Sequence, residues 1–241
     1  MPPNIMWESG ERPRGHEFVC CKNCNRGTSA ADSVAGMMAY VRQDGTTTEK
    51  ETEKIKKIMV SVNERVPGLG DRILSKAKMV MVRSPSGLLR PAYQIHIEDK
   101  VATEVLGVFA AKLGMGLYRE HMGKALPLEG CVMTTWFANS GLTMDQANAI
   151  LDNLPVQGEL KQGKNNAQGK FDYRYGAHAS GDLLMALASF RDSLHIFVIA
   201  VSNEELLNNI TWMTNTTSKF KPGSLVERLK AVGVSGIKQD L

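Results

Sequence analysis

Three cysteines lie within five positions near the N-terminus, in the stretch FVCCKNCNRGTS at residues 18–29. Cys21 and Cys24 are separated by two residues, and a tight turn at that spacing supplies two of the four ligands of a tetrahedral zinc site. Lys22 lies between them, and a neighbouring cation favours the thiolate that binds metal. The spacing therefore predicts half of a structural zinc site.

The remaining zinc ligands have three candidate sources. His16 and Cys20 are close in sequence, although adjacent cysteines rarely ligate together because their side chains diverge. Cys131 or a distant histidine is the second source. A second subunit can contribute its own Cys21 and Cys24 across a two-fold axis, which makes a homo-oligomer with a shared site the third possibility. Without metal, these residues are ordinary thiols or a redox pair, although no thioredoxin-like βαβ context follows them.

The second candidate site lies in residues 110–127, on a predicted helix that is apolar nearly all round. Lys112 is the single charged residue in the middle of this helix, and Arg119, His121 and Lys124 follow it. These side chains predict a cationic pocket for phosphate or another anion, with Lys112, Arg119 and His121 as the candidate catalytic residues of a small-molecule or nucleotide-binding enzyme. The alternatives are a snorkelling lysine, a carboxylate partner elsewhere, and a basic helix end favoured by the helix dipole.

The other histidines give weaker signals. His195 lies within the apolar run LHIFVIAV and is predicted to be a hydrogen-bonded core residue, whereas His96 is predicted to be exposed and His178 lies in a glycine-containing loop. The sequence contains no glycine-rich phosphate loop, nucleophile elbow or H-E-x-x-H metal helix.

The composition is that of a soluble globular protein. Of 241 residues, 43% are apolar and 22% are charged, which is enough to build a core without disulfides. The net charge of +4 is compatible with nucleic acid or another anionic partner. The longest weakly charged run, residues 105–118, is shorter than the ~20 residues of a membrane helix. Because the first residues also lack a signal peptide, a cytoplasmic protein without membrane contact is predicted.

Alternating helix and strand patterns predict an α+β fold. The predicted helices span residues 30–43, 48–66, 100–121, 142–154, 203–213 and 224–232, with a short helix that ends near residue 78. Two strands are predicted around the turn SPSG, with Tyr93, Ile95 and Ile97 on a buried face, and further strands in LEGCVMTTWFANSG, KFDYRYGAH and SLHIFVIAVS. A small irregular cysteine-knuckle element with its following helix (residues 1–45) is predicted to precede a mixed helix and antiparallel-sheet domain (residues 46–241).

The N-terminal segment resembles the second half of an HNH-type (ββα-metal) endonuclease motif. Cys21 and Cys24 resemble the second zinc pair of that family, and Asn25 resembles the asparagine that orders the metal loop. Pro3 resembles the proline that follows the catalytic histidine, and the helix at residues 30–43 resembles the α of the ββα unit. The first Cys-x-x-Cys pair and the catalytic histidine of the family would precede Met1. The resemblance therefore implies an N-terminally truncated or degenerate relative.

The resemblance implies a zinc-binding protein that contacts nucleic acid, with bacterial or phage proteins as its relatives. If the chain is an enzyme, the implied activity is metal-dependent phosphodiester hydrolysis, lost or incomplete without the general base. The implied nucleic-acid-binding residues are Arg12, Arg14, Lys22, Asn25 and Arg26. The alternative functions are a phage- or defence-related interaction protein with a purely structural knuckle, and the enzyme with the cationic pocket.

Overall fold

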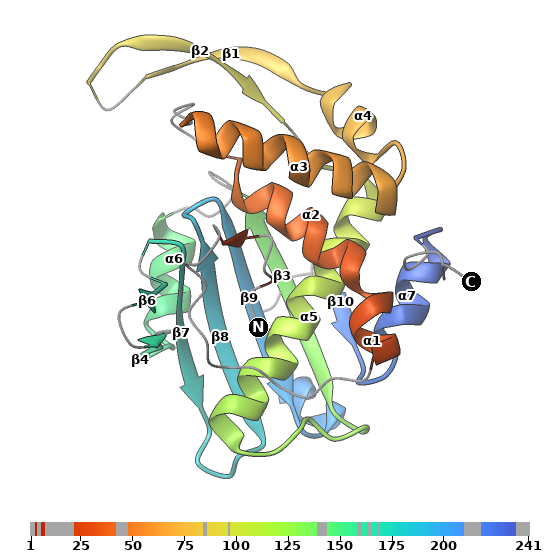
Figure 1. Cartoon of the computed structure of the whole chain (residues 1–241). Helices are drawn as coiled ribbons and strands as arrows, with labels where there is room; N and C mark the ends of the chain where they lie inside the picture. The colour runs from red at the N-terminus through yellow and green to blue at the C-terminus, as the bar shows by residue number, and fades with distance from the viewer. Residues whose placement is uncertain are drawn as a thin grey trace.

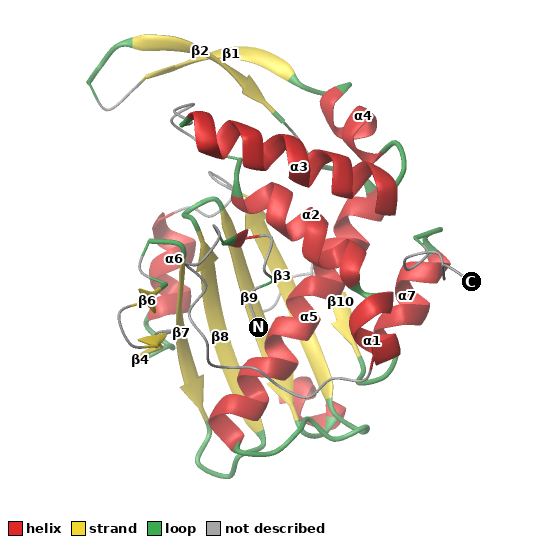
Figure 2. Ribbon diagram, in the orientation of Figure 1, coloured by secondary structure: helices red, strands yellow, loops and turns green. Residues whose placement is uncertain are grey.

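The computed structural model of the chain describes residues 3, 6–7, 22–41, 48–83, 86–95, 97–138, 144–158, 161–162, 165–167, 169–209 and 218–234. An antiparallel sheet forms the middle layer of the body, and helices cover both of its faces (Figures 1 and 2). A two-stranded hairpin extends away from this body. The α+β class predicted from the sequence is confirmed.

The central sheet has the strand order β10-β3-β9-β8-β7-β4, and all neighbouring strands are antiparallel. Its strands are β3 (Cys131–Ala138), β4 (Val156–Gly158), β7 (Phe171–Ala177), β8 (Leu183–Phe190), β9 (Leu194–Val201) and β10 (Ser218–Phe220). A separate pair of two-residue strands consists of β5 (Lys161–Gln162) and β6 (Asn165–Asn166).

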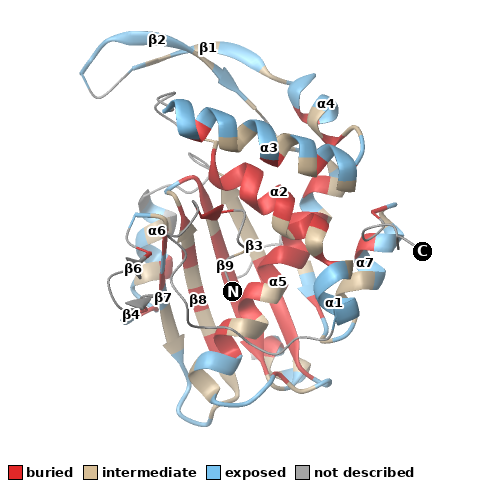
Figure 3. Ribbon diagram, viewed as in Figure 1, coloured by how far each residue is buried: buried red, intermediate tan, exposed pale blue. Residues whose placement is uncertain are grey.

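The helices differ in how much of their surface they bury. They are α1 (Lys22–Gly27), α2 (Ser29–Ala39), α3 (Glu49–Arg65), α4 (Leu69–Leu74), α5 (Lys100–Met122), α6 (Met144–Leu151) and α7 (Leu225–Ala231), together with the 3-10 helix η3 (Glu204–Asn209). Helices α2 and α5 are largely buried, whereas α1 and α3 are mostly exposed (Figure 3).

Helix α5 lies against one face of the sheet, here called the inner face, and forms the centre of the main core. Two glycines allow its close approach: a β-carbon would lie 2.7 Å from the Phe220 ring at Gly107, and 2.7 Å from Val132 at Gly114. The helix is long and apolar enough to span a membrane, but 67% of its most apolar window is buried inside the protein. That burial is typical of the core helix of a soluble protein.

Helices α2 and α3 form a further layer over α5. A capping box begins α3: Thr48 Oγ1 accepts a hydrogen bond from Glu51 N–H, and the Glu51 carboxylate accepts one from Thr48 N–H. The turn between β8 and β9 is tied to this layer by Arg191, which donates to Tyr40 Oη at 2.9 Å and to Glu51 Oε1 at 3.4 Å. The guanidinium also lies 4.0 Å from the Tyr40 ring centroid. These contacts connect α2 and α3 to the sheet.

The opposite, outer face of the sheet has a smaller core under α6 and η3. Leu154, which follows α6, and Leu207 of η3 pack there with Phe197, Ile199 and Cys131 of the sheet. Cys131 is fully buried in this apolar cluster.

The extended hairpin consists of β1 (Lys78–Arg83) and β2 (Leu89–Gln94) and is called the arm below. Its strands pair with each other and with no other described strand. Figure 3 shows it exposed along its length, above α3. A lone two-stranded hairpin is marginally stable in water, so the arm depends on its connection to the folded body.

The structure corrects several predicted elements. Residues after Cys21 form the helix α1 instead of an irregular knuckle turn. The core continues across the predicted boundary at residues 45–46, because buried residues of α2 belong to the same cluster as α5 and the sheet. Tyr93 was predicted to be buried but is 74% exposed, whereas Ile95 and Ile97 do pack against the core. Strand β8 was not predicted.

Candidate nucleic-acid interface

The predicted metal and nucleic-acid residues at the N-terminus are only partly described. The four residues of this prediction that the structure describes, all exposed, lie on α1: Lys22, Cys24, Asn25 and Arg26. Those outside the described residues are Arg12, Arg14, His16, Cys20 and Cys21. Helix α1 packs on α7, since a β-carbon at Gly27 would lie 2.8 Å from Val226. The predicted phosphate contacts on α1 therefore face solvent.

A complete metal site is not present in the part of the chain that the structure describes. None of its His, Cys, Asp and Glu side chains form a group of three or more that could hold an ion. Cys131, one candidate for the missing ligand, is buried under η3 on the outer face of the sheet. Burial raises the pKa of its thiol, and Glu204 raises it further. Cys131 is therefore a thiol of the outer core, and this corrects its prediction as a candidate zinc ligand.

Lys112 has a carboxylate partner. Its Nζ lies 2.7 Å from Asp32 Oδ1 and 2.9 Å from Asp32 Oδ2, which joins α5 to α2. About a quarter of each side chain is exposed, 25% for Lys112 and 24% for Asp32. Of the alternatives left open by the sequence, the carboxylate partner elsewhere is the one observed. The positive charge predicted to face an anion is already balanced by Asp32.

His121, the third residue of the predicted cationic pocket, does not converge on Lys112. His121 stacks on Tyr175 at 3.7 Å between ring centroids, and its Nε2 lies 3.1 Å from Tyr173 Oη. Burial raises the pKa of Tyr173 to about 12. Arg119 is exposed. Lys112 and His121 are nine positions apart on the helix, which places them about 180° apart around the axis and about 13 Å apart along it. The three residues therefore do not form one pocket.

A serine, a histidine and an aspartate lie in one row across the outer face. The register pairs Asp172 with Ser189 and Ser189 with His195, and Ser189 Oγ lies 3.0 Å from His195 Nδ1. Burial lowers the pKa of His195 and raises that of Asp172. In a catalytic triad the histidine lies between the other two, whereas here the serine does. The row does not have the order that serine hydrolysis requires, and His195 is a hydrogen-bonded, half-buried residue.

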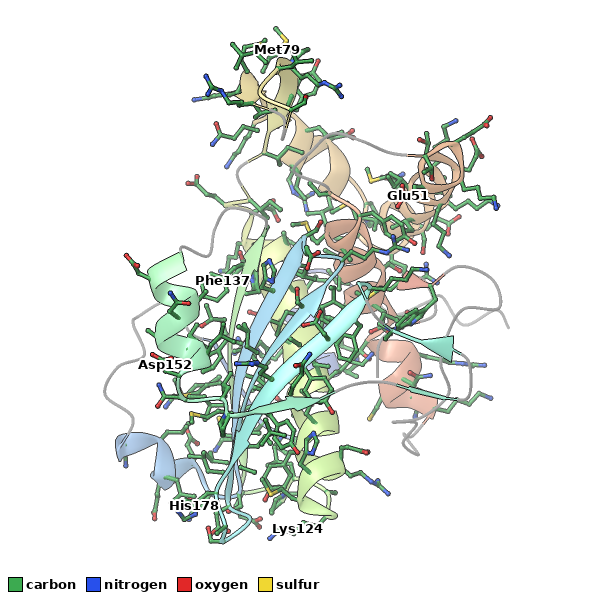
Figure 4. The ribbon with its side chains drawn as sticks, turned by 90° about the vertical axis from the view of Figure 1, so that its left-hand side faces the viewer. Glu51, Met79, Lys124, Phe137, Asp152 and His178 are labelled. Carbon is green, nitrogen blue, oxygen red and sulfur yellow. The ribbon has the colours of Figure 1, made fainter. Side chains whose placement is uncertain are left out.

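The arm has a one-sided distribution of charge. Residues 73–97 contain four basic and no acidic residues, which equals the net charge of +4 of the whole chain, so the rest of the chain is neutral overall. The four basic side chains are all exposed: Lys76, Lys78, Arg83 and Arg90. Figure 4 shows the arm with Met79 at one end of the molecule and His178 and Lys124 at the other. The excess positive charge is thus concentrated on the arm and at its foot.

One face of the arm is also apolar and exposed. Met79 lies opposite Tyr93 in the register, and Met81 lies opposite Pro91, so these side chains share a face. Met79 is 71%, Met81 59% and Tyr93 74% exposed. Leu89, on the same face, is 61% exposed. The arm therefore presents apolar and aromatic surface beside its cations.

The foot of the arm is fixed to the body by an ion pair. Arg72 Nε of α4 lies 2.8 Å from Asp99 Oδ2, and Asp99 also caps α5 by accepting from Ala102 N–H at 2.9 Å. Partial burial alone would raise the pKa of Asp99, but the hydrogen bonds from Ala102 and Arg72 outweigh it, and the pKa is lowered. The segments that enter and leave the arm are thereby held together.

The sequence predicted the strands of the arm, but no candidate site was placed there. The available signal was the run of 25 residues, 73–97, without an acidic side chain. The sites predicted from the sequence lie elsewhere, at the N-terminal cysteines and in residues 110–127. Figure 1 places α1 and the arm in different parts of the molecule, so they are separate surfaces.

Comparison of the chain with protein-family models, with curated proteins and with solved structures found no match. The resemblance to HNH-type nucleases therefore depends on Cys21, Cys24, Asn25 and the residues around them alone.

Proposed function

We propose that this chain is a cytoplasmic nucleic-acid-binding protein whose main contact surface is the arm. The observation that supports the proposal is the concentration of positive charge on and beside an exposed two-stranded ribbon: residues 73–97 have a net charge of +4, and three of their four cations lie on the ribbon itself. Nucleic acids are polyanions, and Lys and Arg contacts to phosphates supply most of the sequence-independent affinity. A two-stranded ribbon is also narrow enough to enter the major groove of DNA.

The arm offers two kinds of contact to a nucleic acid. The basic side chains on the arm, with Lys76 at its foot, suit phosphates, whereas Tyr93 and the methionines beside it suit sugars and the faces of unstacked bases. In this proposal the N-terminal cysteine segment is a separate zinc-supported element. Its exposed Lys22, Asn25 and Arg26 provide a second, smaller basic surface. No described side-chain group supplies a nuclease centre, so the proposed activity is binding.

The second candidate function is an interaction protein, and the apolar face of the arm favours it. Met79, Met81 and Tyr93 expose apolar surface that a protein partner would bury. A protein partner with an acidic rim would satisfy the same basic side chains. Dependence of binding on salt and on nucleic acid separates this function from the first.

The deciding experiment compares two variants with equal net charge. In the arm variant, Gln replaces Lys76, Lys78, Arg83 and Arg90. In the control variant, Gln replaces four exposed lysines elsewhere: Lys50, Lys56, Lys57 and Lys230. Binding of a fluorescent DNA duplex and of a single strand is measured by anisotropy between 50 and 300 mM salt. We expect the affinity of the arm variant to fall about 100-fold at low salt. The slope of log K against log salt concentration should become less steep by about three.

The control variant should retain most of the affinity. Equal losses in the two variants would show that binding follows overall charge and would contradict the proposal. No binding of either nucleic acid by the wild-type protein at 50 mM salt would favour the interaction protein instead.

A further inference from the structure

A cavity of about 420 Å³ lies beside the foot of the arm. Its described lining comes from three elements: Thr103 and Gly107 of α5, Thr134, Thr135, Trp136 and Phe137 of β3, and Ser218 of β10. Thr103 N–H donates to Asp99 O at 2.9 Å, so Thr103 is one helical turn from the residue that anchors the arm. The volume is within the range of small-molecule sites.

The cavity follows the edge of β3. Successive side chains of a strand point to opposite faces of the sheet, so a cavity lined by four consecutive residues must extend around the edge of the strand. Strand β10 pairs with β3 only up to Thr134, and no described strand pairs with the rest of that edge. Alternate backbone N–H and C=O groups of residues 135–137 lie on this side, away from β9. The edge therefore offers donors and acceptors in addition to the side chains.

Thr134 gives an independent sign of a missing ligand. Thr134 is 2% exposed, and its hydroxyl has no hydrogen-bond partner among the residues that the structure describes. A buried hydroxyl without a partner costs stability, and such groups are rare in folded proteins. A ligand that bonds this hydroxyl in the cavity would remove the cost.

The lining determines the chemistry of the ligand. No described lining residue carries a charge, so a charged ligand would have no counter-charge there. Four hydroxyls, each able to donate and to accept, come from Thr103, Thr134, Thr135 and Ser218. Trp136 and Phe137 add aromatic surface for stacking. A planar, uncharged heterocycle with both donors and acceptors on its edge matches all three features.

We infer that this cavity binds a nucleobase. The base comes either from a free nucleoside or from a single strand held by the arm. The second source rests on the proposed function, whereas the first does not. Thr134 bonds the edge of the base, and Trp136 stacks on its face.

The test follows the indole N–H resonances of the chain, which has three tryptophans. Trp136→Phe assigns the signal of Trp136. Adenosine, guanosine, cytidine, uridine and an unstructured ten-nucleotide strand are titrated separately, with glucose as an uncharged control. We expect at least one nucleoside or the strand to shift the Trp136 signal saturably, with no shift from glucose. Thr134→Val is expected to weaken this binding about five- to tenfold.

Thr134→Val should also change the stability of the protein, and in the opposite direction to the affinity. This second measurement is informative even if binding is weak. Because the substitution removes a buried hydroxyl without a partner, it should raise Tm by about 2–4 °C. Thr52→Val, on the exposed surface of α3, is the matched control and should change neither quantity.

The arm variant distinguishes the two sources. A nucleoside that still binds when the arm is neutralised identifies a free ligand, and this result stands even if the arm binds no nucleic acid. A Trp136 shift given only by the strand, and lost in the arm variant, identifies a base within a strand. Failure of every nucleoside and of the strand to shift Trp136, or an equal response to glucose, would overturn the inference.

Discussion

At the scale of single residues, the meaning of Lys112 depends on a partner that is 80 positions away in the sequence. Seen alone on an apolar helix, the lysine suggests an anion site. With Asp32 at 2.7 Å, it is one half of an ion pair that holds α5 against α2. Removal of one partner from a partly buried pair leaves the other charge poorly solvated, which costs more than the pair itself contributes.

We therefore predict that Lys112→Ala lowers the free energy of unfolding by about 1–2 kcal/mol, between the values for exposed and buried pairs. Asp32→Ala should cost a similar amount, and the double variant should cost less than the two single variants combined. Urea unfolding followed by circular dichroism measures all three. Lys100→Ala, at an exposed position of the same helix, is the control and should be nearly neutral. Additive losses would show that the pair is not coupled.

At the scale of elements, the arm is structurally separate from the body. Its strands pair only with each other, and its foot is closed by Arg72 and Asp99 outside the hairpin itself. The main core runs through α2, α5 and the sheet without any residue of β1 or β2. The described core therefore does not depend on the arm, and in the proposed function the arm is a binding element added to the fold.

Replacement of residues 78–94 by a short Gly-Ser linker should leave Tm within about 2 °C of the wild-type value, because no core surface is lost. The same variant should lose nucleic-acid binding. Phe220→Ala, which opens the core next to Gly107, should lower stability by about 3–5 kcal/mol and shows that the assay detects the loss of core packing. Aggregation or unfolding of the armless variant would show that the arm is part of the folded core.

Local signals in the sequence were sufficient for some elements and insufficient for others. The start of α3 was predictable because Thr48 and Glu51 form a capping box within four residues. Strand β8 was missed because LLMALASF is an apolar run with little polar alternation, and such runs do not distinguish strand from helix.

The sites depended on information that local patterns do not contain. The exposure of Tyr93 follows from the absence of a layer over the arm, and the cavity follows from the point at which β10 ends. Neither is encoded by spacing along the chain. The run without acidic residues was the one local sign of the proposed interface.

At the scale of the whole molecule, the position of α1 bears on how a zinc site would be completed. Cys24 is exposed on α1, whereas Cys131 is buried on the far side of the sheet. A second copy of the chain can approach an exposed helix, and a two-fold axis would bring two Cys21/Cys24 pairs together. Sharing between subunits is therefore the arrangement we propose for the metal.

We predict one zinc per two chains and a dimer in solution, measured by elemental analysis and by light scattering on the same sample. Cys24→Ser should remove both the zinc and the dimer, because a tetrahedral site with two ligands missing binds weakly. Cys131→Ala, in the outer core, should keep both. One zinc per monomer would instead indicate completion by His16 or Cys20, and a metal-free, fully folded monomer would contradict the zinc site.

The placement of charge on the arm has a consequence for how the protein meets its partner. The arm carries three cations and no acidic residue, while the rest of the chain has a net charge of +1, so the excess positive charge lies at one end of the molecule. In the field of a polyanion this uneven charge favours orientations with the arm forward before contact, which raises the fraction of productive collisions. At 0.1 M salt the field is screened beyond about 10 Å, so the reorientation happens only in the last stage of approach.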